Sequence, residues 1–320
     1  MATLLAVCAS AQKGTAKAEV PSALLVAGHG LQGDAHAGDW HRQVSLLEVA
    51  AIDEMRAAGL QLQYGAFGEN LVVEGLAVEE LGLGSEVQVG TARLVVTQIG
   101  KTCHHPCAIF HAVGRCIMPE QGVFMAVLDG GAVSPGDEAV VTRRVAREVI
   151  QVAIVTVSDR SARGERADAS GPALGEFIER ELQAHVAVRL IVPDEFEEIK
   201  ATLENLTQRK GLDLILTTGG TGCAPRDVTP EATRAVIQRE APGLAEQMRA
   251  QSMLVTPRAM LSRAVAGLAE RCLIINLPGS PTGAVENLQA VAKALPHAVE
   301  LLRGAALDCC LLYTSDAADE

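Results

Sequence analysis

Apolar positions in the second half of the chain follow two alternating patterns. A run of consecutive apolar residues predicts a buried strand at 152–157, and further apolar runs predict strands at 186–192, 213–218 and 271–277. Between them, apolar residues recur at helical spacing and predict amphipathic helices over 174–182, 197–210 and 285–302, with further helices beginning at Pro230 and Pro242. This alternation is typical of an α/β domain whose mainly parallel sheet is covered by helices on both faces.

The first half lacks this alternation. It holds short β-like runs, many glycines and one convincing helical pattern, LLEVAAIDEMRAAG at 46–59. These features predict a mostly β, barrel-like N-terminal domain. The pattern changes near Arg143–Glu148, so we expect domains at 1–146 and 147–308. The segment 309–320 continues no predicted element, and we interpret it as a disordered or artefactual tail.

Composition narrows the functional classes. The chain is 48% hydrophobic, which predicts globular domains. Its net charge of −12 and aromatic content of 2% argue against a nucleic-acid partner. It has no apolar run of about 18 residues that would span a membrane. The first apolar patch has no basic region before it, so we expect a cytoplasmic protein whose eight cysteines are reduced.

One motif in the first half imitates a nucleotide site. The segment GHGLQGD places Gly28, Gly30 and Gly33 at the spacing of a dinucleotide fingerprint. That fingerprint requires a helix to begin at the glycines, whereas DAHAGDWHRQ follows with two more helix-breaking signals. We therefore interpret the segment as a turn that needs positive φ angles.

Polar or glycine-rich segments follow all four strands of the second half. They are Ser158-Asp159, Pro193-Asp194, GGTGCAPRDVTPE after Thr218, and PGSPTG from Pro278. The carboxyl ends of parallel strands meet at one edge of a sheet, where ligands bind in open α/β folds. The sequence therefore predicts that these four segments form one site.

The glycine-rich loop indicates anion binding with a metal nearby. Gly219, Gly220 and Gly222 leave backbone N–H groups free to surround an anion, and Thr229 is placed to cap the next helix. Asp194 and Asp227 flank the loop. A single aspartate here is equally explained as a capping or turn residue. Two converging carboxylates would instead hold Mg²⁺ together with substrate phosphates.

These segments, with VPDE upstream and MLSR and NLPGSPTGAVENL downstream, resemble the molybdopterin adenylyltransferase family over about residues 149–303. The resemblance implies transfer of AMP from ATP to molybdopterin with Mg²⁺ and release of pyrophosphate. It also implies a homotrimer and a molybdate-insertion enzyme acting downstream.

The resemblance implies roles for individual residues. Asp194 and Asp227 match the family's catalytic acidic residues and would bind Mg²⁺. With the loop residues above, the expected nucleotide- and pterin-binding set is Ser158, Asp159, Thr218, Gly219, Gly220, Thr221, Gly222, Arg226, Ser262, Asn276, Pro278, Gly279 and Ser280. Nearby Arg226 would help to offset the repulsion between two anionic reactants. The alternative is a non-enzymatic carrier or scaffold that binds the pterin without turnover.

The first half resembles a MOSC domain, named after the C-terminal domain of molybdenum-cofactor sulfurases, over about residues 3–143. The segments that carry the resemblance are GLQGDAHAGDWHRQVSLL, FGENL, LVVTQIGKTCHHPC and GRCIMPEQGVFMAVLDGGAVSPGDE. It implies a barrel-like fold that binds molybdenum cofactor or carries sulfur on a cysteine. Cys103 occupies the family's cysteine position, and a sulfur donor protein would then be a partner.

The segment GKTCHHPC leaves several readings open. A thiolate at Cys103, with a pKa lowered by Lys101 or neighbouring histidines, is the interpretation we favour. Cys103, Cys107 and nearby histidines supply enough ligands for a structural zinc site, but not at a familiar spacing. A disulfide, or inert buried cysteines, are the remaining alternatives.

Overall fold

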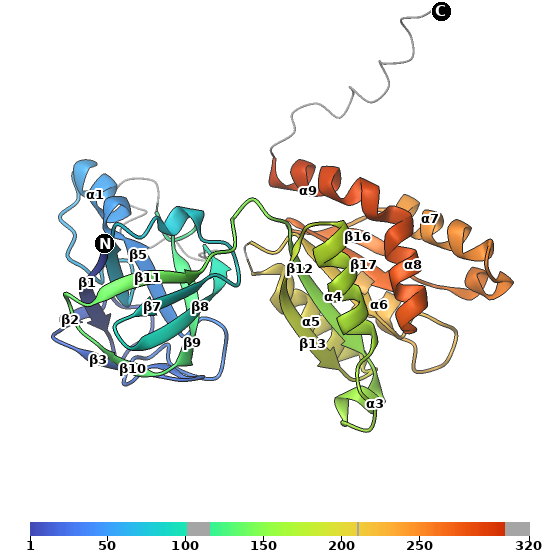
Figure 1. Cartoon of the computed structure of the whole chain (residues 1–320), viewed down its shortest axis with the longest axis horizontal. Helices are drawn as coiled ribbons and strands as arrows, with labels where there is room; N and C mark the ends of the chain where they lie inside the picture. Colours follow the sequence, from blue (N-terminus) through green and yellow to red (C-terminus); the bar gives the residue numbers. More distant parts are fainter. Residues whose placement is uncertain (101–115, 210, 305–320) are drawn as a thin grey trace, which may run out of the picture. The chain divides into compact units, whose positions relative to one another are not determined.

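The structure is a computed structural model that describes residues 1–100, 116–209 and 211–304 (Figure 1). The chain divides into two compact units. The first unit comprises Met1–Val149 with Arg209–Gly211, and the second comprises Ile150–Gln208 with the chain from Leu212. Among the described helices, none combines the length and the apolar character that a membrane crossing requires.

The first unit is mostly β-structure, as predicted. Its elements are β1 (Ala2–Ala9), β2 (Ala18–Val20), β3 (Ala23–Val26), β4 (Gly30–Leu31), β5 (Val44–Glu48), α1 (Val49–Ala57), β6 (Leu71–Glu74), the 3₁₀ turn η1 (Val78–Glu80), β7 (Glu86–Val89), β8 (Ala92–Ile99), β9 (Val123–Asp129), β10 (Gly131–Val133) and β11 (Glu138–Arg143).

Seven of these strands close into a barrel. Their order is β11-β7-β8-β9-β5-β6-β1, and β1 also pairs with β11, so the sheet returns to its first strand. Strand β2 extends the sheet from β1, while β10, β3 and β4 form a separate small sheet. The barrel-like fold predicted for the first half is confirmed.

The helix predicted at 46–59 was partly wrong. Its first three residues belong to β5, which pairs with β6 in parallel and with β9 in antiparallel orientation. The residues Val44–Leu47 are all buried, so this strand has core on both of its faces. A strand buried on both faces loses the alternating pattern, and its apolar run merges with the stripe of the following helix α1.

The glycines of GHGLQGD form turns, as predicted. Gly28, Gly30 and Gly33 have φ angles of 66°, 106° and 81°. They lie in and beside the hairpin of β3 and β4, and the described chain forms no helix between Gly33 and β5. A side chain at Gly30 would also collide with the carbonyl of Gln43, 2.7 Å from the position of a Cβ.

The second unit alternates strands and helices. Its elements are β12 (Gln151–Val157), α3 (Asp159–Ala162), α4 (Ser170–Glu181), β13 (His185–Val192), α5 (Phe196–Thr207), β14 (Leu214–Thr218), α6 (Thr229–Arg234), β15 (Arg239–Glu240), α7 (Pro242–Met253), the 3₁₀ turn η2 (Pro257–Leu261), β16 (Ala266–Ala269), β17 (Cys272–Leu277), α8 (Pro281–Val291), the 3₁₀ turn η3 (Ala292–Ala294) and α9 (Leu295–Arg303).

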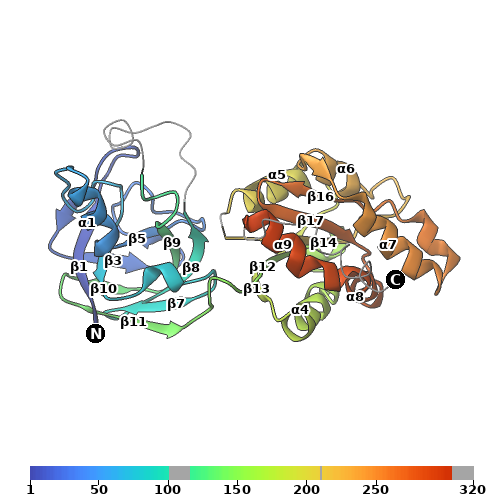
Figure 2. The same ribbon diagram turned by 90° about the horizontal axis from the view of Figure 1, so that it is seen from above.

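The sheet of the second unit has the strand order β13-β12-β14-β17-β16-β15. The four predicted strands pair in parallel, whereas β16 and β15 add an antiparallel edge that the sequence did not reveal. Helices α4, α7, α8 and α9 share one apolar core with the sheet. Figure 2 shows α5 and α6 on the opposite face, so the predicted covering of both faces is confirmed.

Candidate active site

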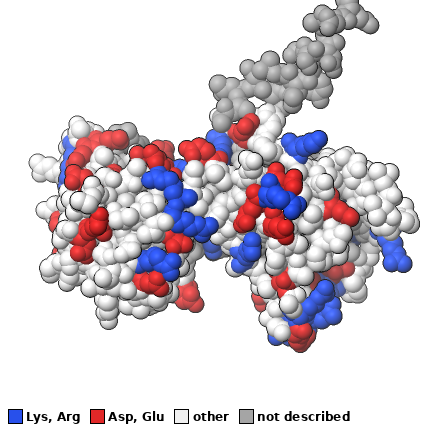
Figure 3. Space-filling model, viewed as in Figure 1, with Lys and Arg blue, Asp and Glu red and all other residues white. Residues whose placement is uncertain are grey.

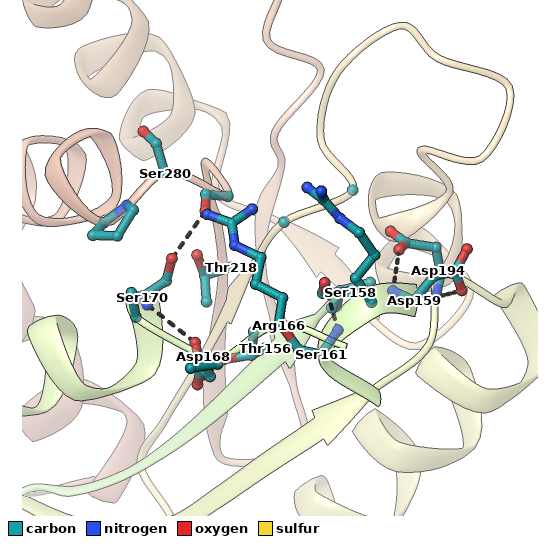
Figure 4. A pocket seen from close by; sticks show the side chains of 18 of the residues that line it. Thr156, Ser158, Asp159, Ser161, Arg166, Asp168, Ser170, Asp194, Thr218 and Ser280 are labelled. Atoms are coloured by element: carbon teal, nitrogen blue, oxygen red, sulfur yellow. Dashed lines mark hydrogen bonds between the residues drawn. The ribbon is translucent and has the colours of Figure 1, made fainter. Parts of the chain in front are cut away.

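The four predicted loops meet at the carboxyl edge of the parallel strands, where they surround a cavity of about 620 Å³ (Figure 4). Eight predicted site residues line it: Ser158, Asp159, Asp194, Thr218, Gly219, Gly220, Gly279 and Ser280. The convergence follows from the parallel pairing of β12 with β13 and β14, and of β14 with β17.

The glycine loop can be formed only by glycine at two positions. Gly219 has a φ angle of 110°, and a Cβ there would lie 2.2 Å from the backbone oxygen of Val157. Gly220 has a φ angle of 62°, and a Cβ there would lie 2.3 Å from Thr229 Oγ1. Because neither position has a side chain, the loop backbone packs against the end of β12 and lines the cavity. The Gly219 N–H itself is not free for a ligand, since it donates to the Leu277 carbonyl at 3.1 Å.

Thr229 acts on this loop and not as the predicted helix cap. Its hydroxyl donates to the Gly219 carbonyl at 2.9 Å, while the cap position of α6 is Val228. The side chain of Thr229 is fully buried, so the bond is shielded from water. Thr229 therefore fixes the first glycine of the loop to the start of α6.

Asp194 and Asp159 hold each other through reciprocal backbone bonds. The N–H of Asp159 donates to Asp194 Oδ2 at 2.8 Å, and the N–H of Asp194 donates to Asp159 Oδ1 at 3.1 Å. Arg226 pairs with Asp159 at 2.7 Å and with Glu195 at 2.7 Å. The charge of Arg226 is thus already matched by two carboxylates at the rim of the site.

Asp194 is a partly buried carboxylate. Burial, and then the negative charges of Asp159 and Asp227, raise its pKa above the usual value. Its Oδ1 lies 3.2 Å from the Cβ position of Gly220, and Asp227 Oδ2 lies 2.8 Å from that of Gly222. The two predicted metal ligands therefore face the glycine loop at neighbouring positions.

These carboxylates fit a magnesium ion that is completed by substrate. Among the described residues, no three His, Cys, Asp or Glu side chains are gathered closely enough to enclose a metal by themselves. Mg²⁺ commonly uses one or two carboxylates together with phosphates and water. The mutual repulsion between Asp194 and Asp227 is also what a bound cation would relieve.

Arg263 clamps the far side of the glycine loop, a role the sequence did not suggest. Its Nε donates to the Gly222 carbonyl at 2.6 Å, and its Nη atoms bond the Asp227 carbonyl and Glu231. Its backbone N–H donates to the Thr221 carbonyl at 3.0 Å. Four bonds from one residue thus fix the segment that carries Asp227.

Three predicted binding residues support the site from outside the cavity lining. Asn276 is fully buried, and its amide donates to Thr217 and Thr233 at 2.9 and 2.8 Å. The carbonyl of Pro278 accepts from Thr218 at 2.6 Å. Ser262 is half-buried beside Arg263, and its carbonyl accepts from an arginine of α7. Thr221, Gly222, Arg226 and Asp227 likewise lie next to the lining and not in it.

Three arginines of the cavity were not among the predicted site residues. Arg160, Arg163 and Arg166 line the cavity and follow strand β12 directly. Figure 3 shows basic and acidic side chains side by side over α3, where Arg163 pairs with Glu165 at 2.8 Å. Arg160 and Arg166 form no ion pair with the residues that the structure describes, and Figure 4 shows Arg166 reaching into the cavity. The signal was present in SDRSARGER, which has an arginine at every third position.

Asp168, also missed, organises the opposite wall. Its Oδ1 accepts from the N–H groups of Ser170 and Gly171 at 3.0 Å, and its Oδ2 accepts from Thr156 at 2.9 Å. The Ser170 hydroxyl donates to the Gly279 carbonyl at 2.9 Å. These bonds join the start of α4 to β12 and to the loop after β17.

The predicted thiol Cys103 and its neighbour Cys107 lie outside the described residues. Among the described cysteines, Cys8 and Cys272 are buried, and burial raises the pKa of each thiol to about 12. Cys223, within the glycine-rich segment, is exposed, and its thiol donates to the Leu261 carbonyl at 3.5 Å.

The class of this domain follows from its mainly parallel sheet and from the glycine loop and three arginines that surround one crevice. The second unit is an α/β domain with a polar, arginine-lined cavity at the carboxyl ends of its parallel strands, the edge where ligands bind in folds of this class.

Comparison with known proteins gives the family. Residues 153–297 match a probable molybdopterin binding domain, and residues 33–140 match the MOSC domain. A molybdopterin adenylyltransferase of Haemophilus influenzae is 41% identical over 174 residues, covering 50% of this chain and 88% of the relative. One from Helicobacter pylori is 42% identical over 161 residues, covering 49% of this chain and 90% of the relative. The chain belongs to the molybdopterin adenylyltransferase family, a family of nucleotidyltransferases in molybdenum-cofactor biosynthesis, and it also carries a MOSC domain.

Solved structures match the same half of the chain. A molybdopterin biosynthesis enzyme MoaB from Thermus thermophilus is 53% identical, covering 49% of this chain and 98% of its own, with a TM-score of 0.47.

Proposed function

We propose that the second unit transfers AMP from Mg-ATP to the terminal phosphate of molybdopterin and releases pyrophosphate. The observation that carries the proposal is the juxtaposition of Asp194 and Asp227 on a glycine loop that borders an arginine-lined cavity. The names of the relatives agree with this activity. An oxygen of the molybdopterin phosphate forms the new bond to the α-phosphorus of ATP, and the bond to the pyrophosphate oxygen breaks.

The reaction joins two anions, so the site must offset their repulsion. Arg160 and Arg166 offer guanidinium groups that form no ion pair with a described carboxylate, and the glycine loop borders the same cavity at Gly220. Mg²⁺ held by Asp194 and Asp227 would supply additional positive charge where the phosphates meet. No proton needs to be removed from a phosphate oxygen that is already ionised at neutral pH, so the reaction needs no general base.

The remaining residues position these groups. The N–H of Asp159 holds one oxygen of Asp194 and leaves the other facing Gly220. Arg263 fixes the backbone of Asp227, and Thr229 fixes Gly219. Preorganisation of this kind supplies most of what phosphoryl and nucleotidyl transfer requires of a protein.

The test is incubation of the purified chain with molybdopterin, ATP and Mg²⁺, with detection of both adenylylated molybdopterin and pyrophosphate. The proposal requires both products, in equal amounts, and their loss on chelation of Mg²⁺. The alternative function, a carrier or scaffold, requires molybdopterin binding without either product. Asp194→Asn serves as the matched inactive control.

We propose that the first unit, as a MOSC domain, binds molybdenum cofactor or carries sulfur through Cys103. Its match to the MOSC model supports this function. Within the sulfur-carrying function, a sulfur donor protein is a partner, and a molybdate-insertion enzyme acts on the product of the second unit. Metal analysis separates this function from its alternative, in which the cysteine–histidine segment is a structural zinc site.

We further propose that the second unit assembles as a homotrimer. A run of exposed apolar side chains around the end of α7 and η2 supports self-association, since apolar groups of this size gain from burial. They are Met253, Leu254, Val255, Met260 and Leu261, of which Leu254 and Val255 are 80% and 75% exposed.

A further inference from the structure

Arg42 in the first unit is a half-buried cation with no counter-charge among the described residues. Its Nε is shielded from solvent and has no hydrogen-bond partner in that part of the chain. None of the ion pairs in the described chain includes it, and burial lowers the pKa of its guanidinium. Partial burial of an unpaired charge is unfavourable and usually persists only where a ligand or a function requires it.

Two aromatic rings hold this guanidinium in place. Its central carbon lies 4.7 Å from the centre of the Trp40 ring and 5.8 Å from that of Phe124. The indole N–H of Trp40 donates to the His36 carbonyl at 2.7 Å, which fixes the ring. Phe124 is buried in strand β9. Ring faces stabilise a cation, but they supply no hydrogen-bond acceptor for its N–H groups.

The backbone around Arg42 is equally fixed. The Thr97 hydroxyl donates to the His41 carbonyl, and the Gln43 N–H donates to the Met125 carbonyl at 3.1 Å. The side-chain oxygen of Gln43 accepts from Val127 at 2.9 Å. The segment is thus anchored to β8 and β9 on both sides of Arg42.

Two other arginines of this unit, Arg56 and Arg93, are each paired with a carboxylate. Arg56 also stacks on an aromatic ring, that of Tyr64 at 5.0 Å, but it pairs with Asp53 at 2.9 Å. Arg93 pairs with Asp129 at 2.7 Å and with a second carboxylate. The buried Lys17 differs from Arg42 in the same way, because it forms an ion pair with Asp34 at 2.7 Å.

The neighbouring histidine does not change the balance of charge. His41 shares a hydrogen bond of 2.9 Å with Gln98 through its Nε2. Burial, and then a nearby arginine, lower the pKa of His41 to about 4, so the ring is neutral at physiological pH. His41 therefore adds no charge, and the cations at this position are Arg42 and Arg209, whose pKa is lowered by burial and then by the charge of Arg42.

We propose that Arg42 binds an oxyanion, a phosphate or molybdate group, and that this is a ligand contact of the first unit. A guanidinium presents its N–H groups in a plane that matches two oxygens of such a group. The rings and the anchored backbone hold the fork in advance, so little freedom is lost on binding. This site is independent of the adenylyl transfer proposed for the second unit.

Trp40 provides a direct readout, because it is the single tryptophan of the chain. Its emission is followed while inorganic phosphate or molybdate is added to the full-length protein, with chloride at matched ionic strength as the salt control. The expected result is a saturable change with either oxyanion and none with chloride. A difference of tenfold or more in affinity between phosphate and molybdate identifies which oxyanion the site prefers.

Arg42→Gln should weaken the titration at least tenfold. Arg42→Lys keeps the positive charge but loses the planar pair of N–H donors, so it should weaken the affinity for the oxyanion severalfold. If Arg42→Gln does not fold, the result for Arg42→Lys tests the proposal. Arg56→Gln is the matched control for a stacked but paired arginine, and Arg166→Gln controls for anion binding in the second unit. Both should titrate as the parent chain does. Unchanged titration in both Arg42 variants, or equal loss in Arg56→Gln, overturns the proposal.

Discussion

The hydrogen bonds of Arg263 to the glycine-rich loop predict how strongly Arg263→Ala should reduce catalysis by the second unit. Arg263→Ala removes three side-chain bonds but leaves the backbone bond to Thr221. The bond to Glu231 is between groups that are 36% and 44% exposed, and such pairs contribute about 0–1 kcal/mol. The two bonds to the carbonyls of Gly222 and Asp227 contribute about 1 kcal/mol each.

Arg263→Ala is therefore expected to lose about 2 kcal/mol of the interaction free energy that holds the loop in position. If all of it is expressed in the transition state, kcat falls about 30-fold, since about 1.4 kcal/mol corresponds to a factor of ten. Arg263 does not line the cavity, so the KM for molybdopterin should change little. The concentration of Mg²⁺ needed for half-maximal rate should rise, because the clamp fixes the backbone of Asp227.

The assay is steady-state production of adenylylated molybdopterin over a series of Mg²⁺ concentrations. Arg258→Ala is the matched control, because Arg258 is exposed on the adjacent η2 and its side chain bonds no described residue. Arg263→Lys keeps the charge without the fork and should fall between the parent and the alanine variant. A kcat for Arg263→Ala within twofold of that of Arg258→Ala would refute the reasoning, as would a loss confined to the KM for molybdopterin.

Four further predictions concern the acidic pair, the stability of the fold, the thiols and the assembly. Asp194→Asn and Asp227→Asn should each retain the fold and lose Mg²⁺-dependent transfer; turnover like that of the parent in either variant removes that residue from the mechanism. The raised pKa of Asp194 means that its charge destabilises the fold above that pKa, so Asp194→Asn should raise the melting temperature at pH 7. That gain should shrink as the pH falls through the pKa of the carboxyl, and a constant gain would contradict the assignment. Cys103 should alkylate rapidly near neutral pH while Cys8, with its pKa raised to about 12, should not; comparable rates, or one tightly held zinc, would exclude the thiolate. Light scattering should report a trimer at micromolar concentration, and a strict monomer would count against assembly through the second unit.

Hydrophobic patterns in the sequence predicted the structure best where a single physical cause, such as burial on both faces of a strand, produced them. The strands β12, β14 and β17 are buried throughout, so their apolar runs were continuous and easily recognised. Their parallel pairing, together with that of β12 and β13, then required the loops at Asp194 and Gly219 to meet at one edge. The short strands β15 and β16 escaped notice because two and four residues, one of them Gly267, leave no readable period.

The supporting residues could not be predicted in this way. Arg263 bonds carbonyls that lie 36 and 41 positions away in the chain, and a backbone carbonyl leaves no trace in residue type. Asn276 was expected to bind ligand because of its motif, but its amide joins Thr217 to Thr233. Which polar side chain faces a cavity and which braces its wall depends on tertiary contacts that a linear pattern does not contain.

The closure of the barrel has a consequence for biosynthesis on the ribosome. Ala2 in β1 pairs with Ala139 in β11, so the barrel cannot close until its last strand along the chain has been synthesised. Until the nascent chain has emerged beyond β11, both β1 and β7 present open edges on which another chain can add a strand. The first unit is therefore expected to fold after its translation is nearly complete, while the ribosome is already producing β12. Slow codons shortly after β11 would give the barrel time to close before the next sheet begins to emerge.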